Sequence, residues 1–133
     1  NQLKKINKIS KIRQKNYNTF KKYLYKFHYQ KCNTDVLSNF GFATLVSNRD
    51  EVFKHLSKRK IECRPIIAGN ISNQLFWKKS QKKQKFPIAN LIHDHGIYLP
   101  NHINLSKQDI IYICKEFIKK AKVITKNNLF IDK

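Results

Sequence analysis

Two short clusters of side chains in the sequence are of types that could do chemistry. His93, Asp94 and His95 place two imidazoles two residues apart, a spacing that on a strand would aim both at one metal ion. Cys63 is followed by Arg64, whose positive charge could lower the thiol pKa and favour a nucleophilic thiolate. Each cluster has a structural alternative, namely a polar helix-to-strand corner for the histidines and a strand-core cysteine for the thiol. We favour the structural alternatives and assign no catalytic or metal-binding residue.

The usual stand-alone catalytic motifs are absent from the sequence. It contains no GxSxG elbow, P-loop, GxGxxG or HExxH, and three glycines cannot build a glycine-rich phosphate loop. The three cysteines, at positions 32, 63 and 114, have no CxxC spacing, which argues against both a disulfide framework and a zinc site. These counts predict a reducing, cytoplasmic setting.

The charge of the chain suggests an anionic partner. The 133 residues hold 28 Lys and Arg against 8 Asp and Glu, a formal net charge of +20. Residues 1–31 carry no acidic residue, and a lysine-rich run at 78–85 follows the aromatic pair Phe76 and Trp77. Such mixtures of basic and aromatic residues can bind single-stranded nucleic acid or an anionic surface. Only four of the basic residues are Arg, however, and Lys lacks the bidentate fork of phosphate and base readers, so nucleic-acid binding is kept as the alternative function.

The hydrophobic pattern predicts an α+β fold. Apolar residues recur at helical spacing over residues 2–29, which predicts one long helix. Three short strands are predicted, at 41–47, 61–65 and 97–99, and helices are expected after Asn48, over 87–93 and after Ser106. The last helix has a capping-box start, Ser106 with Asp109. The fold class is therefore a long N-terminal helix followed by a small antiparallel sheet of about three short strands with helices on one face.

Length and pattern also predict the domain organisation. We expect a linking helix at 1–31, one small α+β domain at 32–122 and a tail at 123–133. Residues 66–85 form the least regular stretch, and a long loop in a small domain is commonly functional. The sequence holds no apolar run of about 20 residues, so no membrane span is expected. It starts with Asn1 and contains no Met, which predicts a piece of a longer protein.

The order of several motifs resembles the C-terminal part of the DegT/StrS family, fold-type I enzymes that use pyridoxal or pyridoxamine phosphate on nucleotide-linked keto sugars. In chain order the motifs are residues 38–42 (SNFGF), 49–51 (RDE), 61–65 (IECRP), 68–70 (AGN), 86–90 (FPIAN), 97–100 (IYLP) and 105–106 (LS). The predicted first helix, with Arg13 and Asn16 three residues apart, resembles the long helix that leads into the family's small domain. The resemblance covers nearly the whole chain.

This resemblance implies both a fold and a function. The chain is expected to be the small C-terminal domain of a sugar aminotransferase or dehydratase of lipopolysaccharide or other surface-polysaccharide biosynthesis, with residues 64–70 most like the sugar 3-dehydratases. The cofactor-bonding Lys, or the His that replaces it in dehydratases, belongs to a large N-terminal domain outside this sequence. None of the present residues is therefore assigned to the cofactor, and the piece alone is expected to be inactive. The full-length protein is expected to be a cytoplasmic homodimer that binds a nucleotide sugar, without an iron–sulfur cluster.

Two residues of the segment after the second predicted strand are candidates for substrate binding. Arg64 could donate charge-assisted hydrogen bonds to a diphosphate or carboxylate, and Asn70 could donate to and accept from sugar hydroxyls. The alternative is that Arg64 pairs with Glu62 or with the large domain, and that Gly69 and Asn70 only form a turn. Both interpretations stay open at the level of sequence.

Overall fold

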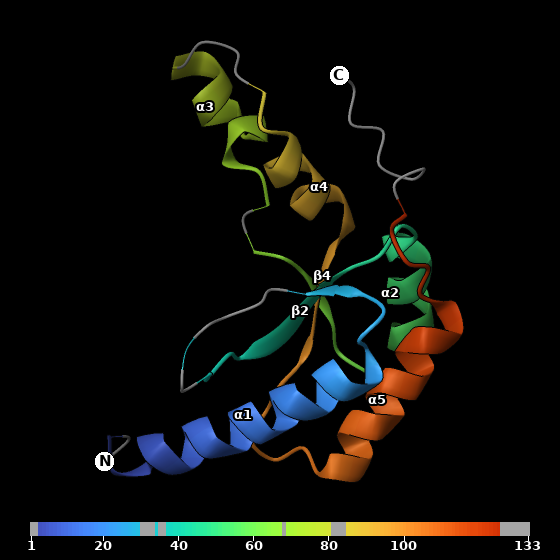
Figure 1. The fold of residues 1–133 in the computed structure, drawn as a ribbon. Helices are drawn as coiled ribbons and strands as arrows, with labels where there is room; N and C mark the ends of the chain where they lie inside the picture. Colours follow the sequence, from blue (N-terminus) through green and yellow to red (C-terminus); the bar gives the residue numbers. More distant parts are fainter. Residues whose placement is uncertain (1–2, 30–33, 35–36, 68, 81–84, 126–133) are drawn as a thin grey trace.

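A four-stranded antiparallel sheet with the order β1-β2-β4-β3 forms the centre of the computed structural model (Figure 1). The structure describes residues 3–29, 34, 37–67, 69–80 and 85–125, except the side chains of residues 78–80. The strands are β1 (His28–Tyr29), β2 (Gly41–Leu45), β3 (Arg64–Pro65) and β4 (Gly96–Pro100). β2 and β4 pair over their whole length, from Gly41 opposite Pro100 to Leu45 opposite Gly96.

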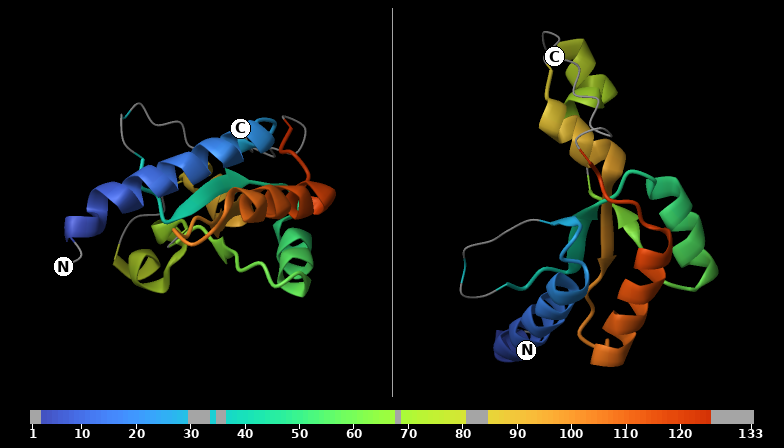
Figure 2. Two further views of the ribbon diagram at one scale, coloured as in Figure 1. Left: turned by 90° about the horizontal axis from the view of Figure 1, so that it is seen from below. Right: turned by 45° about the vertical axis from the view of Figure 1, so that its right-hand side comes forward.

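Three helices lie along one face of this sheet, which is the α+β arrangement expected from the sequence (Figure 2). They are α1 (Ile6–Tyr23), preceded by the 3₁₀ turn η1 (Leu3–Lys5), α2 (Arg49–Lys58) and α5 (Lys107–Lys120), with α5 packed against both α1 and α2. The turn η2 (Ile71–Asn73) and the helices α3 (Leu75–Ser80) and α4 (Pro87–His95) project from the end of the sheet as an arm (Figure 1). The name "the arm" refers below to residues 71–80 and 87–95.

The core lies between the sheet and the three helices. Alternate residues of the strands point toward this core. The completely buried ones include Phe42 of β2, Val46 just after β2, and Ile97 and Leu99 of β4. Phe42 is the centre of an aromatic group, with ring centroids 5.3 Å from Tyr17, 5.0 Å from Phe20 and 5.8 Å from Tyr29. This group fixes α1 on the sheet, and burial of each such aromatic side chain stabilises the fold by about 2–3 kcal/mol.

The first helix is shorter than the sequence pattern predicts. It ends at Tyr23 rather than at residue 29, and a turn leads into β1, a fourth strand that the sequence analysis missed. Leu24 and Phe27, which continue the apolar stripe, are buried in the same core from the turn. His28 and Tyr29 then pair with Leu45 and Thr44 of β2. The prediction failed because tertiary strand pairing outweighed a periodic pattern that fits both conformations.

Other predicted elements are largely confirmed. α5 begins with the expected capping box, in which Asp109 N donates to Ser106 Oγ at 3.1 Å and Ser106 N donates to Asp109 Oδ2 at 2.8 Å. Residues 66–85 were predicted as a loop, and this prediction is wrong for the parts that form η2 and α3. Ile124 of the predicted tail is buried, while Cys32, most of the 78–85 lysine run and residues 126–133 lie outside the described part. No helix among the described residues has the length and apolar content to cross a membrane.

A buried carboxylate joins α5 to α2. Glu116 of α5 is only 3 % exposed. Its carboxylate lies 3.0 Å from Nε2 of His55 and 3.3 Å from Nε of Arg59, and it also pairs with Nζ of Lys119. Its pKa lies below the ordinary value of 4.5, chiefly because Lys119 donates a hydrogen bond, with His55 and Arg59 adding to the effect against the opposing effect of burial. The ionised carboxylate is thus the form that the folded state stabilises.

This environment gives a pH dependence of stability. A carboxyl whose folded pKa is depressed contributes stability above its unfolded pKa, here about 4.5, and loses it as the pH falls through the folded value. We expect the free energy of unfolding, measured by urea titration with far-UV circular dichroism, to fall on acidification below that pH. Glu116→Gln should lower stability near neutral pH and flatten the acid limb. Parallel pH profiles for the two proteins would contradict the assignment.

Candidate functional site

The face of the sheet opposite α1, α2 and α5 is called the open face below. By strand alternation, β2 presents Gly41, Ala43 and Leu45 there. β4 presents Tyr98, and Arg64 of β3 lies directly opposite Tyr98 and so shares its face. His28 of β1 pairs with Leu45 and so shares this face. The open face therefore combines Gly41, Ala43 and Leu45 with the side chains of His28, Tyr98 and Arg64.

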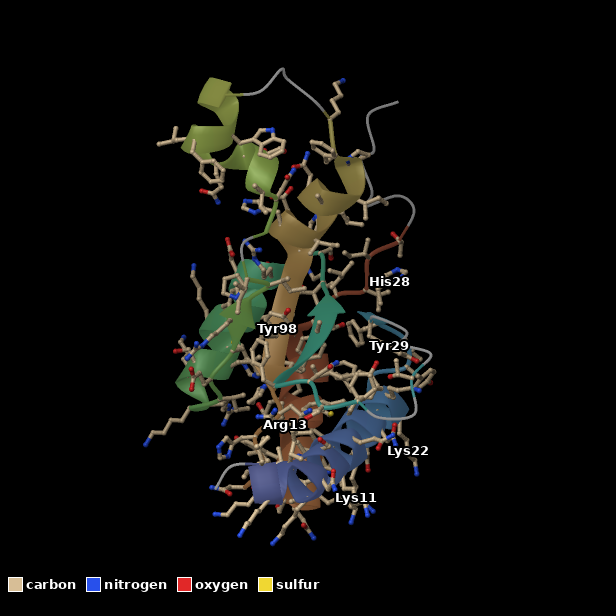
Figure 3. The ribbon with its side chains drawn as sticks, turned by 90° about the vertical axis from the view of Figure 1, so that its left-hand side faces the viewer. Lys11, Arg13, Lys22, His28, Tyr29 and Tyr98 are labelled. Carbon is tan, nitrogen blue, oxygen red and sulfur yellow. The ribbon has the colours of Figure 1, made fainter. Side chains whose placement is uncertain are left out.

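A cavity of about 300 Å³ lies at the end of the sheet where β2 begins and β4 ends, beside α1, and we call it the Arg64 cavity. Its lining comes from three regions, with Arg13 from α1, Phe40 and Gly41 at the start of β2, and Arg64 from β3. The cavity is completed by Glu62, Cys63, Tyr98, Leu99, Pro100, Asn101 and His102. Figure 3 shows Arg13 on the side of α1 that faces Tyr98.

Arg64 lies at this cavity in an ion pair. Its Nη2 and Nε donate to Oε1 of Glu62 at 2.6 and 3.0 Å, which is the pairing considered as an alternative in the sequence analysis. The side chains are 69 % and 72 % exposed, and such surface pairs contribute about 0–1 kcal/mol. The guanidinium can therefore exchange Glu62 for another anion at low cost.

Asn70 lies in a different environment. It is 4 % exposed, caps η2 by accepting from Ser72 N at 2.9 Å, and donates from Nδ2 to Asn90 Oδ1 at 2.6 Å. Its backbone N donates to Nδ1 of His93 at 3.2 Å. Asn70 is not among the described residues that line the Arg64 cavity. The structure thus places the two predicted site residues on one segment but not in one cavity.

The histidine cluster is explained by hydrogen bonds around the arm. His93 and His95 lie in the last turn of α4 rather than on a strand. His93 Nδ1 accepts from Asn70 N, and its backbone carbonyl accepts from Nη1 of Arg49. His95 Nδ1 lies 3.1 Å from the carbonyl oxygen of Val46. Within the described ranges, no group of three His, Cys, Asp or Glu residues could hold a metal ion.

The cysteine beside Arg64 is in an unfavourable setting for a nucleophile. Burial raises the pKa of the Cys63 thiol to about 11, and the negative charge of Glu62 adds to the increase. The thiol is therefore protonated near neutral pH, which agrees with the structural interpretation of this residue.

Arg13 is a cavity residue that sequence analysis treated only as part of a helix motif. The helix carrying it is tied to the end of β4 by two buried asparagines. Asn101 Nδ2 donates to the carbonyl oxygens of Arg13 at 3.3 Å and Asn39 at 2.8 Å, and Asn16 Nδ2 donates to that of His102 at 3.3 Å. The spacing of Arg13 and Asn16 was visible in the sequence, but their meeting with residues 101 and 102 required the tertiary fold.

A second cavity, of about 460 Å³, lies further along the open face toward the arm. It is mainly apolar, with Ala43 and Leu45 of β2, Ile66, and Ile92 of α4 in its lining. Tyr98 contributes to both cavities and separates the charged end of the open face from the apolar end. This surface can therefore accept a ligand or chain segment with one anionic and one apolar part.

Comparison with known proteins defines the class to which this fold belongs. Solved structures that match it include the GDP-4-keto-6-deoxy-D-mannose 3-dehydratase of Escherichia coli with bound hydrated pyridoxal phosphate. That match has a TM-score of 0.75 and 24% identity over 87% of this chain and 32% of the dehydratase chain. The chain thus shares its fold with a segment of that dehydratase. The chain belongs to the DegT/DnrJ/EryC1/StrS aminotransferase family, whose sequence profile matches residues 1–118.

Two curated relatives share about a third of their aligned residues with the chain. A GDP-perosamine synthase of Escherichia coli O157:H7 is 32% identical over 111 residues, covering 80% of this chain and 28% of the relative. A GDP-4-keto-6-deoxy-D-mannose 3-dehydratase of Yersinia pseudotuberculosis is 34% identical over 121 residues, covering 80% of this chain and 30% of the relative. The chain therefore spans less than a third of the length of these enzymes.

The close approach of Gly69 to His93 gives a test of how the segment after β3 packs against α4. Gly69 has φ +51°, and a Cβ built there would lie 2.0 Å from Nδ1 of His93. Gly69→Ala should lower the free energy of unfolding by about 1–3 kcal/mol, measured by urea titration. In a His93→Ala background the cost should shrink, because only the backbone strain remains. Equal costs in both backgrounds would contradict the contact.

Proposed function

We propose that this chain is the small C-terminal domain of a cytoplasmic enzyme that transaminates or dehydrates a nucleotide-linked keto sugar for surface-polysaccharide synthesis. The observation that carries the proposal is the family match over residues 1–118 together with two relatives named for GDP-linked sugars. These comparisons fit this function and do not fit the alternative of a free-standing nucleic-acid-binding module.

Exposed apolar side chains support the view that this domain works within a larger protein. Ile71 of η2, Leu75 and Phe76 of α3, and Ile88 of α4 are each at least half exposed. Clusters of this kind commonly mark contacts with another domain or subunit. The proposal therefore includes a large N-terminal domain and a homodimer of the full-length protein.

The proposed cofactor, pyridoxal or pyridoxamine phosphate, is assigned to that large domain. The two cavities described above have no lysine among the described residues of their lining, so neither offers a side chain that could bond the cofactor. We therefore derive no chemical step from the present residues. In the full-length enzyme the cofactor would supply the electron sink, and this domain would contribute binding and closure around the substrate.

We propose Arg64 as a direct contact to the anionic part of the substrate. Its support is an exposed guanidinium at a cavity, held by a carboxylate that it can exchange. We retain Asn70 as a substrate-binding residue in the same proposal, although a sugar hydroxyl would have to replace its bond to Asn90 or Ser72. In the described conformation Asn70 instead shapes the segment that follows β3.

The full-length reading frame provides the decisive experiment. The protein that includes the residues before Asn1 should purify with a visible absorbance from bound pyridoxal phosphate, removable by exchange with excess pyridoxamine phosphate. The 133-residue chain alone should show none. A reading frame without a fold-type I large domain, or a full-length protein that binds no cofactor, would overturn the proposal.

In that full-length enzyme, Arg64→Gln should lower kcat/KM for the nucleotide sugar about tenfold to a hundredfold, because a charge-assisted hydrogen bond contributes about 1.5–3 kcal/mol. The loss should lie mainly in KM, with cofactor absorbance retained. Lys58→Gln, an exposed charge change on α2, is the matched control and should leave KM unchanged. Equal KM values in the two variants would remove Arg64 from the proposed site.

A further inference from the structure

The Arg64 cavity brings three basic side chains together from separate parts of the chain. Arg13 comes from α1, Arg64 from β3, and His102 lies two residues after the end of β4. Glu62 is the single carboxylate among the described residues of the lining, so the two guanidiniums exceed the acidic charge. Arginine is the side chain best suited to phosphate, because its planar fork can donate two parallel hydrogen bonds.

Arg13 has a donor that the described residues do not satisfy. Its Nη1 donates to the carbonyl oxygen of Ser38 at 3.3 Å, whereas its Nε is buried and has no hydrogen-bond partner in the described part of the chain. A buried charged donor without a partner costs free energy. Arg13 also lines the cavity, so its guanidinium could recover this free energy by turning toward an anion there. Arg13 thus has hydrogen-bonding capacity that its bond to Ser38 does not use.

The residues after β4 add a further donor and an acceptor. Asn104 N donates to Nδ1 of His102 at 3.2 Å, which assigns the ring proton to Nε2 and makes that atom a donor. Asn101 lines the cavity too, and its buried Oδ1 has no hydrogen-bond partner among the described residues, which leaves capacity to accept from a hydroxyl group that reaches it. Donors for phosphate oxygens and an acceptor for a hydroxyl therefore line one cavity.

The size and walls of the cavity limit the ligand. A volume of about 300 Å³ is at the lower end of the range for small-molecule sites. The rings of Phe40 and Tyr98, with centroids 5.1 Å apart, form an apolar wall. These dimensions suit a phosphate or diphosphate group and part of an attached sugar, rather than a whole nucleotide sugar.

We propose that the Arg64 cavity is a binding site for a phosphate or diphosphate group, and that Arg13 is a ligand-binding residue in it. The choice of a phosphate ligand rests on the proposed function, which this inference deepens by adding Arg13 and His102 to Arg64. The anion would replace Glu62 on Arg64 and accept hydrogen bonds from the guanidinium of Arg13.

Inorganic pyrophosphate titrated into the 133-residue chain, followed by calorimetry at about 0.15 M salt, tests the site. The net charge of +20 will attract any anion, so charge-matched controls are essential. Lys11 and Lys22 lie about 160° and 180° around α1 from Arg13, at 100° per residue. Figure 3 shows both on the side of the helix away from Tyr98.

We expect saturable binding that weakens about tenfold or more in Arg13→Gln and Arg64→Gln and stays unchanged in Lys11→Gln and Lys22→Gln. Arg13→Lys keeps the charge but loses the planar guanidinium, so it should weaken binding as well. Circular dichroism of each variant checks the fold. Equal affinity in the Arg13 and Lys11 variants, or no saturable binding, would overturn the proposal.

Competition with GDP identifies the source of the phosphate group. Displacement of pyrophosphate by GDP supports a nucleotide-borne diphosphate at this site, and the absence of displacement supports a free phosphate ligand. Failure of pyrophosphate binding leaves the cofactor experiment on the full-length protein unaffected. A full-length protein without cofactor would, in turn, leave the anion site standing, so the two ideas can fail separately.

Discussion

The packing of α1 against Phe42 is the interaction on which the rest of the architecture depends. Tyr17 and Phe20 of the helix meet that ring from one side of the sheet, and the buried amides of Asn16 and Asn101 fix the helix lengthwise against the end of β4. The helix cannot slide by a residue without breaking both the ring contacts and the amide bonds. It therefore holds Arg13 at a defined position beside the Arg64 cavity.

Much of the fold could be predicted because its local and tertiary preferences agree. The last helix has a capping signal and an apolar stripe that both point to the same element, and the structure confirms them. The region after Tyr23 could not be predicted, because Leu24 and Phe27 satisfy a helical stripe as well as a buried turn. η2 and α3 were missed because Asn70, the cap of η2, stood in a stretch without regular apolar periodicity.

The candidate site was only partly visible in the sequence for a related reason. Arg64 was identified from its neighbours along the chain, but the cavity around it is made by residues up to 51 positions away, as from Arg13 to Arg64. Asn70 was identified as a polar group able to contact a ligand, and the structure shows its amide engaged with Asn90 and Ser72. Linear sequence indicates which groups are present, whereas the fold decides which of them have unsatisfied hydrogen-bonding capacity.

The edges of the sheet have a consequence for assembly. β1 and β3 are both only two residues long, and Pro65 of β3 has no amide hydrogen to offer a neighbouring strand. Two-residue edge strands offer few backbone groups that another strand could pair with, and short edges of this kind protect β proteins from edge-to-edge association. Growth of this sheet into a larger one, within a dimer or a fibril, is thus disfavoured by the described edges themselves. Association through this sheet would therefore depend on contacts between side chains, and single substitutions could strengthen or weaken it.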